Sequence, residues 1–386
     1  MSSKCQASTH NILDFDAIAD CPSVACAQQN GFALFQASKQ VSNGDTIVFS
    51  SGVSFYYMPF SPFRTSDGVW VEPIMMNLTS VIISLEGVLI LHNNYSAWPT
   101  YVHGDKNTTS FYNALHCKHC INYTVTGGGS IYGQGEAWWR AFFIGAIPRQ
   151  RPTVLYLENC ADTIIQHITI YDSPRFNIYG SNVNGFIVRF TTLWVNVREQ
   201  LRIYGIYTGK NVSNLMSIID RKEGSRLTKS DLKSFPVFPY NTDGIDFHGK
   251  NIHIHDLNVS NWDDVVAVKA SDSLYDINCT MNVLVERLNI FIGAGLSIGS
   301  VVPAKRSRCI RNVTFRDSKA LLPLKLIYIK GGTSSNKSAS LSAYVRDILY
   351  ENITAEGSIL WPVYLGPQQQ SEPDGTGWFF FTSCPA

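Results

Sequence analysis

The sequence repeats a short strand pattern and does not alternate it with helices, which limits the folds open to the chain. Each unit starts at an Asn, Asp or Gly turn residue and continues with alternating Val, Ile and aromatic positions. The clearest units span residues 162–170, 184–190, 251–259, 282–290, 312–315 and 347–354. Because long amphipathic helices do not alternate with them, the pattern disfavours a doubly wound sheet or an α/β barrel.

The spacing of the units predicts a parallel β-helix, a solenoid in which each coil buries its inner face against its neighbours. Apart from one longer interval, successive units start 22 to 35 residues apart. An antiparallel sandwich would need tight hairpin turns, whose best candidates, Asn43-Gly44 and Asp67-Gly68, lie outside the repeats. One amphipathic helix is expected at residues 28–41 as a short N-terminal cap. We therefore predict an all-β fold, with residues 1–386 in a single solenoid domain.

Composition and charge exclude several other classes of protein. The 31 basic and 30 acidic residues give a net charge of +1, so neither nucleic acid nor a membrane surface is expected as a partner. No apolar run approaches the roughly 18 residues of a membrane span. Cys117 and Cys120 form a lone CxxC pair, which is insufficient for a structural zinc site. Since there are nine cysteines, at least one is unpaired within the chain.

The compartment is indicated by ten Asn-x-Ser/Thr sequons, which favour a secreted eukaryotic glycoprotein. The alternative is that Asn followed by a β-branched residue simply begins strands in this chain. The first residues lack the basic-then-apolar pattern of a signal peptide. An intracellular chain and a chain whose signal was removed are therefore both open at this point.

A group of carboxylates is the strongest indication of chemistry. Asp243 lies in an Asn241-Thr-Asp-Gly segment and is followed 20 residues later by the pair Asp263-Asp264. This separation is about one coil, and residues one coil apart on the same face lie roughly 4.8 Å apart. Like charges at that distance raise at least one pKa, and glycosidic bond hydrolysis needs one protonated and one ionised carboxyl group. The alternative is that these acids are solvated turn residues at strand ends.

Several motifs, in order along the chain, resemble those of glycoside hydrolase family 28, the polygalacturonase-like pectinases. The matching segments are Gly129–Trp139, Ser173-Pro174, Asn241–Gly244, Asp263-Asp264 and Gly293–Ser300. The resemblance extends from the N-terminal helix to about residue 370. It implies a right-handed parallel β-helix and hydrolysis with inversion.

The resemblance also implies a role for each matched side chain. Asp263 would be the general acid, while Asp243 and Asp264 would hold and activate the attacking water. Inverting enzymes separate their acid and base carboxyls by about 6.5 to 9.5 Å. The residues assigned to substrate binding are Asn241, Lys269, Tyr328 and Lys330, together with Trp262, whose ring is equally expected to stack on a sugar or to pack in the core. No metal ion or cofactor is expected.

Two departures from the family pattern bear on activity. Ala294 stands where the family has a His that supports protonation of the acid. Tyr328 stands where it has an Arg that binds a uronate carboxylate, and Lys330 of the same segment is retained. A Tyr cannot reproduce a bidentate carboxylate clamp. The replacements indicate a divergent eukaryotic branch with an altered substrate, and they leave open a protein that binds carbohydrate without efficient turnover.

The resulting prediction is a secreted, monomeric, inverting glycoside hydrolase that acts on a pectic polysaccharide of the galacturonan type. A pectate-lyase type of β-helix is the remaining alternative, but it would need calcium-binding acids and an Arg base. Members of the family run on for further coils beyond the point where this sequence stops. Trp378–Phe381 is therefore predicted to cover the last coil. His253 and His255 are expected to stack or face solvent rather than bind a metal.

Overall fold

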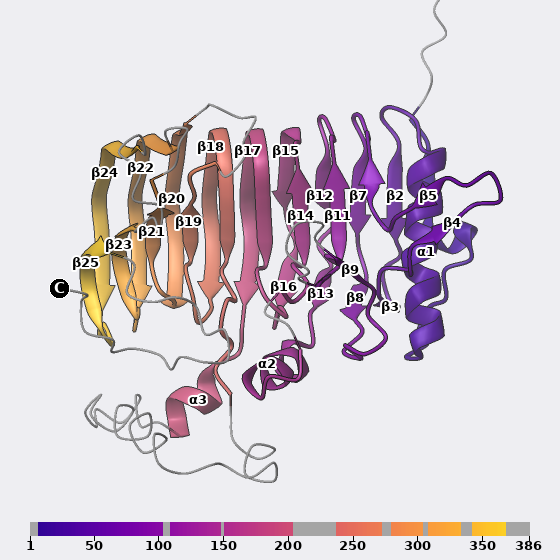
Figure 1. Cartoon of the computed structure of the whole chain (residues 1–386), viewed down its shortest axis with the longest axis horizontal. Coiled ribbons are helices and arrows are strands. Elements are labelled where there is room, and N and C mark those ends of the chain that lie inside the picture. Colours follow the sequence, from indigo (N-terminus) through magenta and orange to yellow (C-terminus); the bar gives the residue numbers. More distant parts are fainter. Residues whose placement is uncertain are drawn as a thin grey trace, which may run out of the picture.

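The chain winds into parallel coils that stack along one axis, with the first coils at one end and the last at the other (Figure 1). The computed structural model describes residues 7–102, 109–147, 150–203, 237–271, 279–303, 308–332 and 342–367. One large sheet links β1 (Thr9–Asn11) to β25 (Trp361–Pro367), and every strand pair described within it is parallel. The predicted all-β parallel β-helix is confirmed.

Each predicted strand unit coincides with observed strands. These are β15 (Ala161–Gln166), β16 (Thr169–Tyr171), β17 (Ile178–Trp194), β18 (Ile245–Ser260), β20 (Thr280–Ile292), β22 (Arg308–Leu321) and β24 (Ala343–Glu356). The longer strands extend beyond the prediction because they bend at residues with positive φ and continue to pair with the next coil. A turn residue in this sequence therefore marks either a corner within a strand or the end of a strand.

The remaining strands complete the coils. In the first half they are β2 (Thr46–Phe49), β3 (Ser54–Tyr57), β6 (Met75–Met76), β7 (Ile82–Leu85), β8 (Val88–Leu91), β11 (Leu115–Lys118), β12 (Thr124–Thr126), β13 (Ser130–Tyr132) and β14 (Leu155–Glu158). In the second half they are β19 (Val266–Val268), β21 (Leu296–Val301) and β23 (Lys325–Gly331). Two small antiparallel pairs lie outside the stack: β4 (Phe63–Arg64) with β5 (Trp70–Val71), and β9 (Thr100–Val102) with β10 (Thr109–Phe111).

The core consists of apolar side chains stacked in columns from coil to coil. One column runs through Ile47, Ile83, Val125, Ile165, Val188, Ile254, Val285 and Phe315, which are paired in register and buried. Alternate positions on each strand point outward, as the pleat requires. The inward side chains stabilise the stack, and the outward side chains of the same strands are available to form a functional site.

The corners are held by a ladder of asparagines. Asn251, Asn282 and Asn312 adopt φ values of 57°, 58° and 53°, a region that Asn tolerates better than most residues. The side-chain amide of each donates to the asparagine one coil earlier: Asn312 to Asn282, Asn282 to Asn251, and Asn251 to Asn184, over 2.9 to 3.0 Å. Asparagine therefore fixes both the bend and the coil register.

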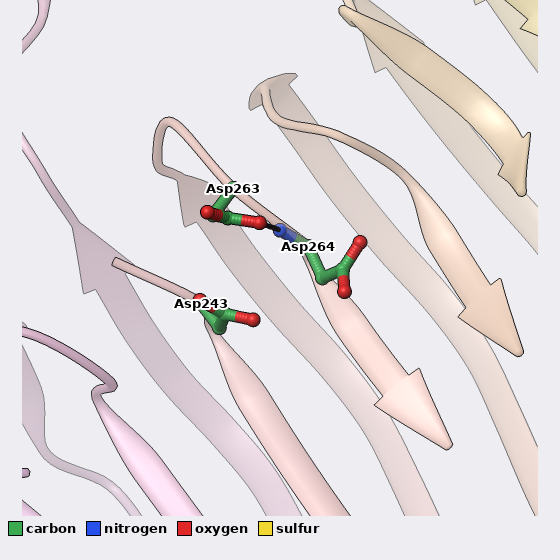
Figure 2. A group of neighbouring side chains, drawn as sticks. All are labelled: Asp243, Asp263 and Asp264. Carbon is green, nitrogen blue, oxygen red and sulfur yellow. Dashed lines mark hydrogen bonds between the residues drawn. The ribbon is translucent and has the colours of Figure 1, made fainter. Parts of the chain in front are cut away.

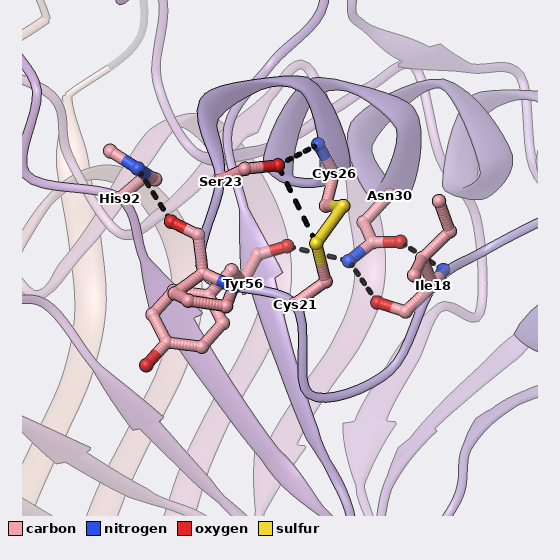
Figure 3. The surroundings of a disulfide bond; sticks show 8 residues. Ile18, Cys21, Ser23, Cys26, Asn30, Tyr56 and His92 are labelled. Atoms are coloured by element: carbon pink, nitrogen blue, oxygen red, sulfur yellow. Dashed lines mark hydrogen bonds between the residues drawn. A yellow bond between two sulfur atoms is a disulfide. The ribbon is translucent and has the colours of Figure 1, made fainter.

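Helix α1 (Val24–Gln40) lies across the N-terminal end of the stack (Figure 1). It starts four residues before the predicted residue 28, because the Ser23 hydroxyl caps it by accepting from the Cys26 amide at 3.1 Å. Figure 3 shows this cap beside the Cys21–Cys26 disulfide. The buried Asn30 amide donates to the carbonyls of Ile18 and Tyr56, which joins the helix to the first coils. The predicted capping helix is confirmed.

The described residues contain three further short helices: the 3₁₀ helix η1 (Ile12–Phe15), α2 (Gly135–Phe143) and α3 (Arg198–Ile203). Among the helices that the structure describes, none has the length and apolar character that crossing a bilayer requires. The predicted C-terminal cap, Trp378–Phe381, lies outside the described residues.

The cysteines form disulfides between Cys21 and Cys26, Cys117 and Cys120, and Cys279 and Cys309. The CxxC pair is thus a disulfide, in agreement with the prediction that it is not a zinc site. Within the described part of the chain, Cys160 is free and buried.

Replacing Asn282 with Ala should lower the free energy of unfolding by about 2 kcal/mol, since the change removes a ladder hydrogen bond and forces a left-handed conformation on Ala. Denaturant unfolding measures the loss. Asn282→Gly tolerates the backbone conformation and should recover roughly half of it. Equal losses in the two variants would contradict a conformational role for the asparagine.

Candidate active site

Three aspartates meet where the chain turns into successive strands of one sheet. Asp243 precedes β18, and Asp263 and Asp264 precede β19 in the next coil. The Gly244 amide donates to the Asp264 carbonyl over 2.8 Å, which holds the two turns in register. One carboxylate oxygen from each aspartate lies within 4.8 Å of those from the other two (Figure 2). The structure therefore brings together the three acids that the sequence singled out.

The carboxyl groups are closer together than the sequence analysis expected. Their closest oxygens lie within 4.8 Å, whereas an inverting pair is typically about 6.5 to 9.5 Å apart and a retaining pair about 5 to 5.5 Å apart. The resemblance, and not this spacing, is therefore the basis for expecting inversion.

Asp264 is the carboxylate that stays ionised. Its side chain is 1% exposed, and burial by itself raises its pKa. The Lys330 and Lys269 ammonium groups outweigh burial: Lys330 contacts Oδ2, and the Nζ of Lys269 lies 3.7 Å from the same oxygen. The Ser297 hydroxyl donates to Oδ1 over 2.6 Å. These contacts hold the pKa of Asp264 below its usual value.

Asp263 is tuned in the opposite direction. It is more exposed than its two partners, and its Oδ2 and Oδ1 accept from the amides of Asn241 at 3.1 Å and Asp264 at 2.9 Å (Figure 2). Burial, followed by repulsion from the ionised Asp264, raises the pKa of Asp263. The pKa values of two adjacent carboxyl groups are therefore shifted in opposite directions, as acid–base catalysis requires.

Asp243 completes the group as a buried acid whose pKa is raised. It is 3% exposed, and burial and the neighbouring Asp246 and Asp263 raise its pKa well above the usual value. Its buried Oδ1 has no hydrogen-bond partner among the described residues. An unpaired buried oxygen beside two other carboxyls is suited to hold a polar reactant.

Asp246 and Ser297 are site residues that the sequence analysis did not assign. Asp246 is fully buried, and burial raises its pKa to about 6 despite the Lys269 ammonium at 3.2 Å. Both residues occupy outward positions of the sheet, where Asp246 is aligned with Ala267 and Ala267 with Ser297. The alternation of side chains along each strand indicates that both residues point outward. It does not show that they lie beside the aspartates, because the sequence does not reveal which residues of neighbouring coils are aligned.

The predicted substrate-binding residues divide into two groups. Lys269 lies 3.2 Å from Asp246 and 3.7 Å from Asp264, and Lys330 contacts Asp264. Asn241 is buried, its side-chain oxygen accepts from the Arg151 guanidinium over 2.8 Å, and its backbone amide holds Asp263. Its contacts are those of a residue that positions the acid.

Trp262 does not have the placement that its predicted sugar-stacking role requires. It is 4% exposed and stacks on Phe238 with ring centroids 4.4 Å apart, within a second apolar cluster. The ring next to the acid therefore serves packing, which the sequence held equally open. The two histidines behave as expected, since the His253 and His255 rings lie 4.2 Å apart and each contacts a carboxylate.

A cleft of about 630 Å³ lies on the N-terminal side of Asp246 and Lys269, and the three aspartates are not among its lining residues. Asp246 and Lys269 line one end of it, and its floor carries outward side chains of β11, β14 and β17. Among these, Tyr156 and Tyr179 are stacked with centroids 5.4 Å apart, and His116 packs edge-on against Tyr156. The cleft thus offers aromatic faces along several coils.

Comparison with known proteins identifies the family. The sequence model of glycosyl hydrolases family 28 matches residues 78–373, which include all three aspartates. The chain belongs to this family. Among curated proteins it is 23% identical to a probable polygalacturonase of Vitis vinifera, over 96% of this chain and 65% of that protein. It is 26% identical to an exopolygalacturonase of Rhizopus delemar, over 84% of this chain and 64% of that protein.

The fold of the family 28 chain agrees with a solved relative. A polygalacturonase from Erwinia carotovora superposes with a TM-score of 0.60 at 16% identity, covering 95% of this chain and 84% of that one. This likeness supports the right-handed β-helix fold. The chain spans just under two thirds of the length of the two curated relatives.

Replacing Lys330 with Met should raise the pKa of Asp264, because burial would then act against a single remaining ammonium. Carbon-13 NMR titration of the labelled carboxyl groups measures the change, which should exceed tenfold in proton affinity, or about 1.4 kcal/mol. Lys319→Met, at an exposed position of β22, is the control and should leave Asp264 unchanged. An unaltered titration in Lys330→Met would show that Lys330 does not set this pKa.

Proposed function

We propose that this chain is a glycoside hydrolase that cleaves a pectic polysaccharide of the galacturonan type. The observation that carries the proposal is the opposite tuning of two adjacent carboxyls, since the pKa of Asp263 is raised and that of Asp264 is lowered. Membership of family 28 and the polygalacturonase names of its relatives support the reaction and the substrate class.

The catalytic steps follow from these protonation states. Asp263, protonated and the most exposed of the three, gives its proton to the glycosidic oxygen as the bond breaks. Asp264, ionised, takes a proton from a water that attacks the anomeric carbon. Asp243 orients that water through its unpaired Oδ1. Lys269 and Lys330 keep Asp264 ionised while its neighbours hold protons.

The cleft next to the acids favours a polymeric substrate. Its floor crosses the outward faces of β11, β14 and β17, so it extends over several strand spacings of about 4.8 Å. Stacked tyrosine rings on this floor offer apolar faces to sugar rings. A single small sugar would not need a surface of this length.

The location, oligomeric state and domain organisation are also proposals. Secretion is supported by the three disulfides, which persist in oxidising compartments. It is also supported by sequons whose asparagines are exposed, namely Asn77, Asn94, Asn122, Asn258, Asn312 and Asn352. The unbroken sheet from β1 to β25 supports a single domain, and we propose that it acts as a monomer.

The second candidate is a protein that binds pectic polymer without efficient turnover. It is favoured by Ala294 and Tyr328, which remove a His and an Arg of the family pattern. A lyase reaction is the third possibility, and it would generate unsaturated products that absorb in the ultraviolet. Hydrolysis yields reducing ends, a lyase yields unsaturated products and a binding protein yields neither, so one assay separates the three candidates.

Wild-type protein should release new reducing ends from polygalacturonate without ultraviolet absorbance, and Asp263→Asn should lower kcat by roughly a thousandfold because the proton donor is lost. Asp347→Asn is the matched control, since this exposed aspartate lies on β24 and Asn suits its φ of 57°. Binding of polygalacturonate with turnover equal to that of Asp263→Asn would favour the second candidate.

The rate of hydrolysis should depend on pH as a bell. Activity is lost at low pH when Asp264, whose pKa is lowered, takes up a proton, and at high pH when Asp263, whose pKa is raised, loses one. Lys330→Met should therefore move the acid limb upward in pH. A shift of the alkaline limb alone would reverse the roles proposed for the two aspartates.

The stereochemistry of hydrolysis tests the role of the attacking water separately. If Asp264 activates a water for direct attack, the first product carries the inverted anomeric configuration. Proton NMR during the first turnovers reads the anomer before mutarotation. Retention would require a covalent intermediate on one of the three aspartates.

A further inference from the structure

Lys325 is a cation near the three aspartates that has no anionic partner among the described residues. It starts β23 and is half-buried. Within the described part of the chain, no carboxylate or other acceptor lies within bonding distance of its ammonium group, in contrast to Lys269 and Lys330. A half-buried charge without a partner has lost part of its hydration without compensation.

Two aromatic rings lie next to the Lys325 ammonium group. The Lys325 Nζ lies 4.0 Å from the ring centroid of Tyr328 and 5.4 Å from that of Tyr364. The two rings are 5.6 Å apart at 72° and form a corner around the charge. Such contacts stabilise a cation modestly and leave its hydrogen-bonding capacity unused. The ammonium group is held in place and remains available to an acceptor.

The coil register places Lys325 in line with the catalytic turns. The Ala294 amide donates to the Asp263 carbonyl over 2.6 Å, and the Leu324 amide donates to the Gly293 carbonyl over 2.8 Å. The pairing of Leu296 with Ile327, extended by two residues, aligns Ala294 with Lys325. Lys325 therefore lies two coils beyond Asp264, and Ala294, whose side chain is a single methyl group, occupies the aligned position of the coil between them.

We propose that Lys325 binds an acidic group of the substrate. The contact lies on the side of the three aspartates that faces the C-terminal coils of the protein, and it makes this site selective for a uronate. Tyr328, at the position where the family pattern has an Arg, serves as the ring that supports this lysine. The proposal rests on the proposed function and identifies Lys325 as the residue that recognises the negative charge of the substrate.

The electrostatic surroundings agree with this assignment. Burial lowers the pKa of Lys325 to about 8, while Asp264 and Asp263 raise it and Lys330 lowers it further. The other groups that face it are the Tyr328 and Tyr364 phenols. The ammonium form therefore predominates below pH 8, and a bound carboxylate would stabilise it. Above pH 8 the neutral amine would no longer attract an acidic sugar.

The test uses the full chain carrying Asp263→Asn, so that ligands bind without being cleaved. The probes are tetragalacturonate and its fully methyl-esterified form, which has the same length without charge. In this background Lys325→Met should weaken binding of tetragalacturonate roughly ten- to a hundredfold, as expected for one charge-assisted contact. Binding of the methyl ester should change less than about twofold, and Lys325→Arg should restore most of the affinity for the acid.

Controls separate this inference from the proposed function. Lys319→Met should leave both affinities unchanged, and binding of tetragalacturonate should fall as the pH rises through about 8 only while Lys325 is present. Equal binding of the acid before and after Lys325→Met, or equal loss for acid and ester, would overturn the inference even if the wild-type chain hydrolyses polygalacturonate. A wild-type chain that neither binds nor cleaves any pectic polymer would overturn the proposed function, and this inference with it.

Discussion

Parallel pairing between successive coils is the interaction on which the rest of the structure depends. It fixes which residue of one coil lies beside which residue of the next, and it does so over the whole length of the sheet. The backbone hydrogen bond from Gly244 to Asp264 is one instance. Through it, acids 20 residues apart in the sequence become neighbours whose charges affect one another. A slip of one residue would turn these side chains to the other face of the sheet.

The energetic cost of gathering acids in a buried place is offset by lysines from neighbouring coils. Lys269 lies between Asp246 and Asp264, and Lys330 contacts Asp264 from two coils further on. This positive charge is distributed unevenly, because it is concentrated on Asp264 and reaches Asp263 and Asp243 only at longer range. The opposite pKa shifts of the adjacent carboxyls are therefore a consequence of where the ammonium groups of Lys269 and Lys330 lie.

The structure relates the two replacements within the family pattern to a neighbouring lysine. Ala294 removes a side chain between the acid pair and the following coil, and Tyr328 replaces a cation by a ring. The ring supports Lys325, which stands in the coil directly after Ala294. The two replacements in the sequence thus accompany a lysine, Lys325, that places a positive charge on this side of the acids.

The sequence by itself determined the fold class, the capping helix and the identity of the three acids. Strand alternation and turn residues are local signals, and the motif spacing happens to equal one coil. Only the tertiary structure decided that Trp262 packs in the core, that Asp246 and Ser297 belong to the site, and that Lys325 lies unpaired beside Tyr328. These outcomes depend on coil register and on burial. Both are set by backbone pairing between segments distant in the sequence, and residue type does not reveal them.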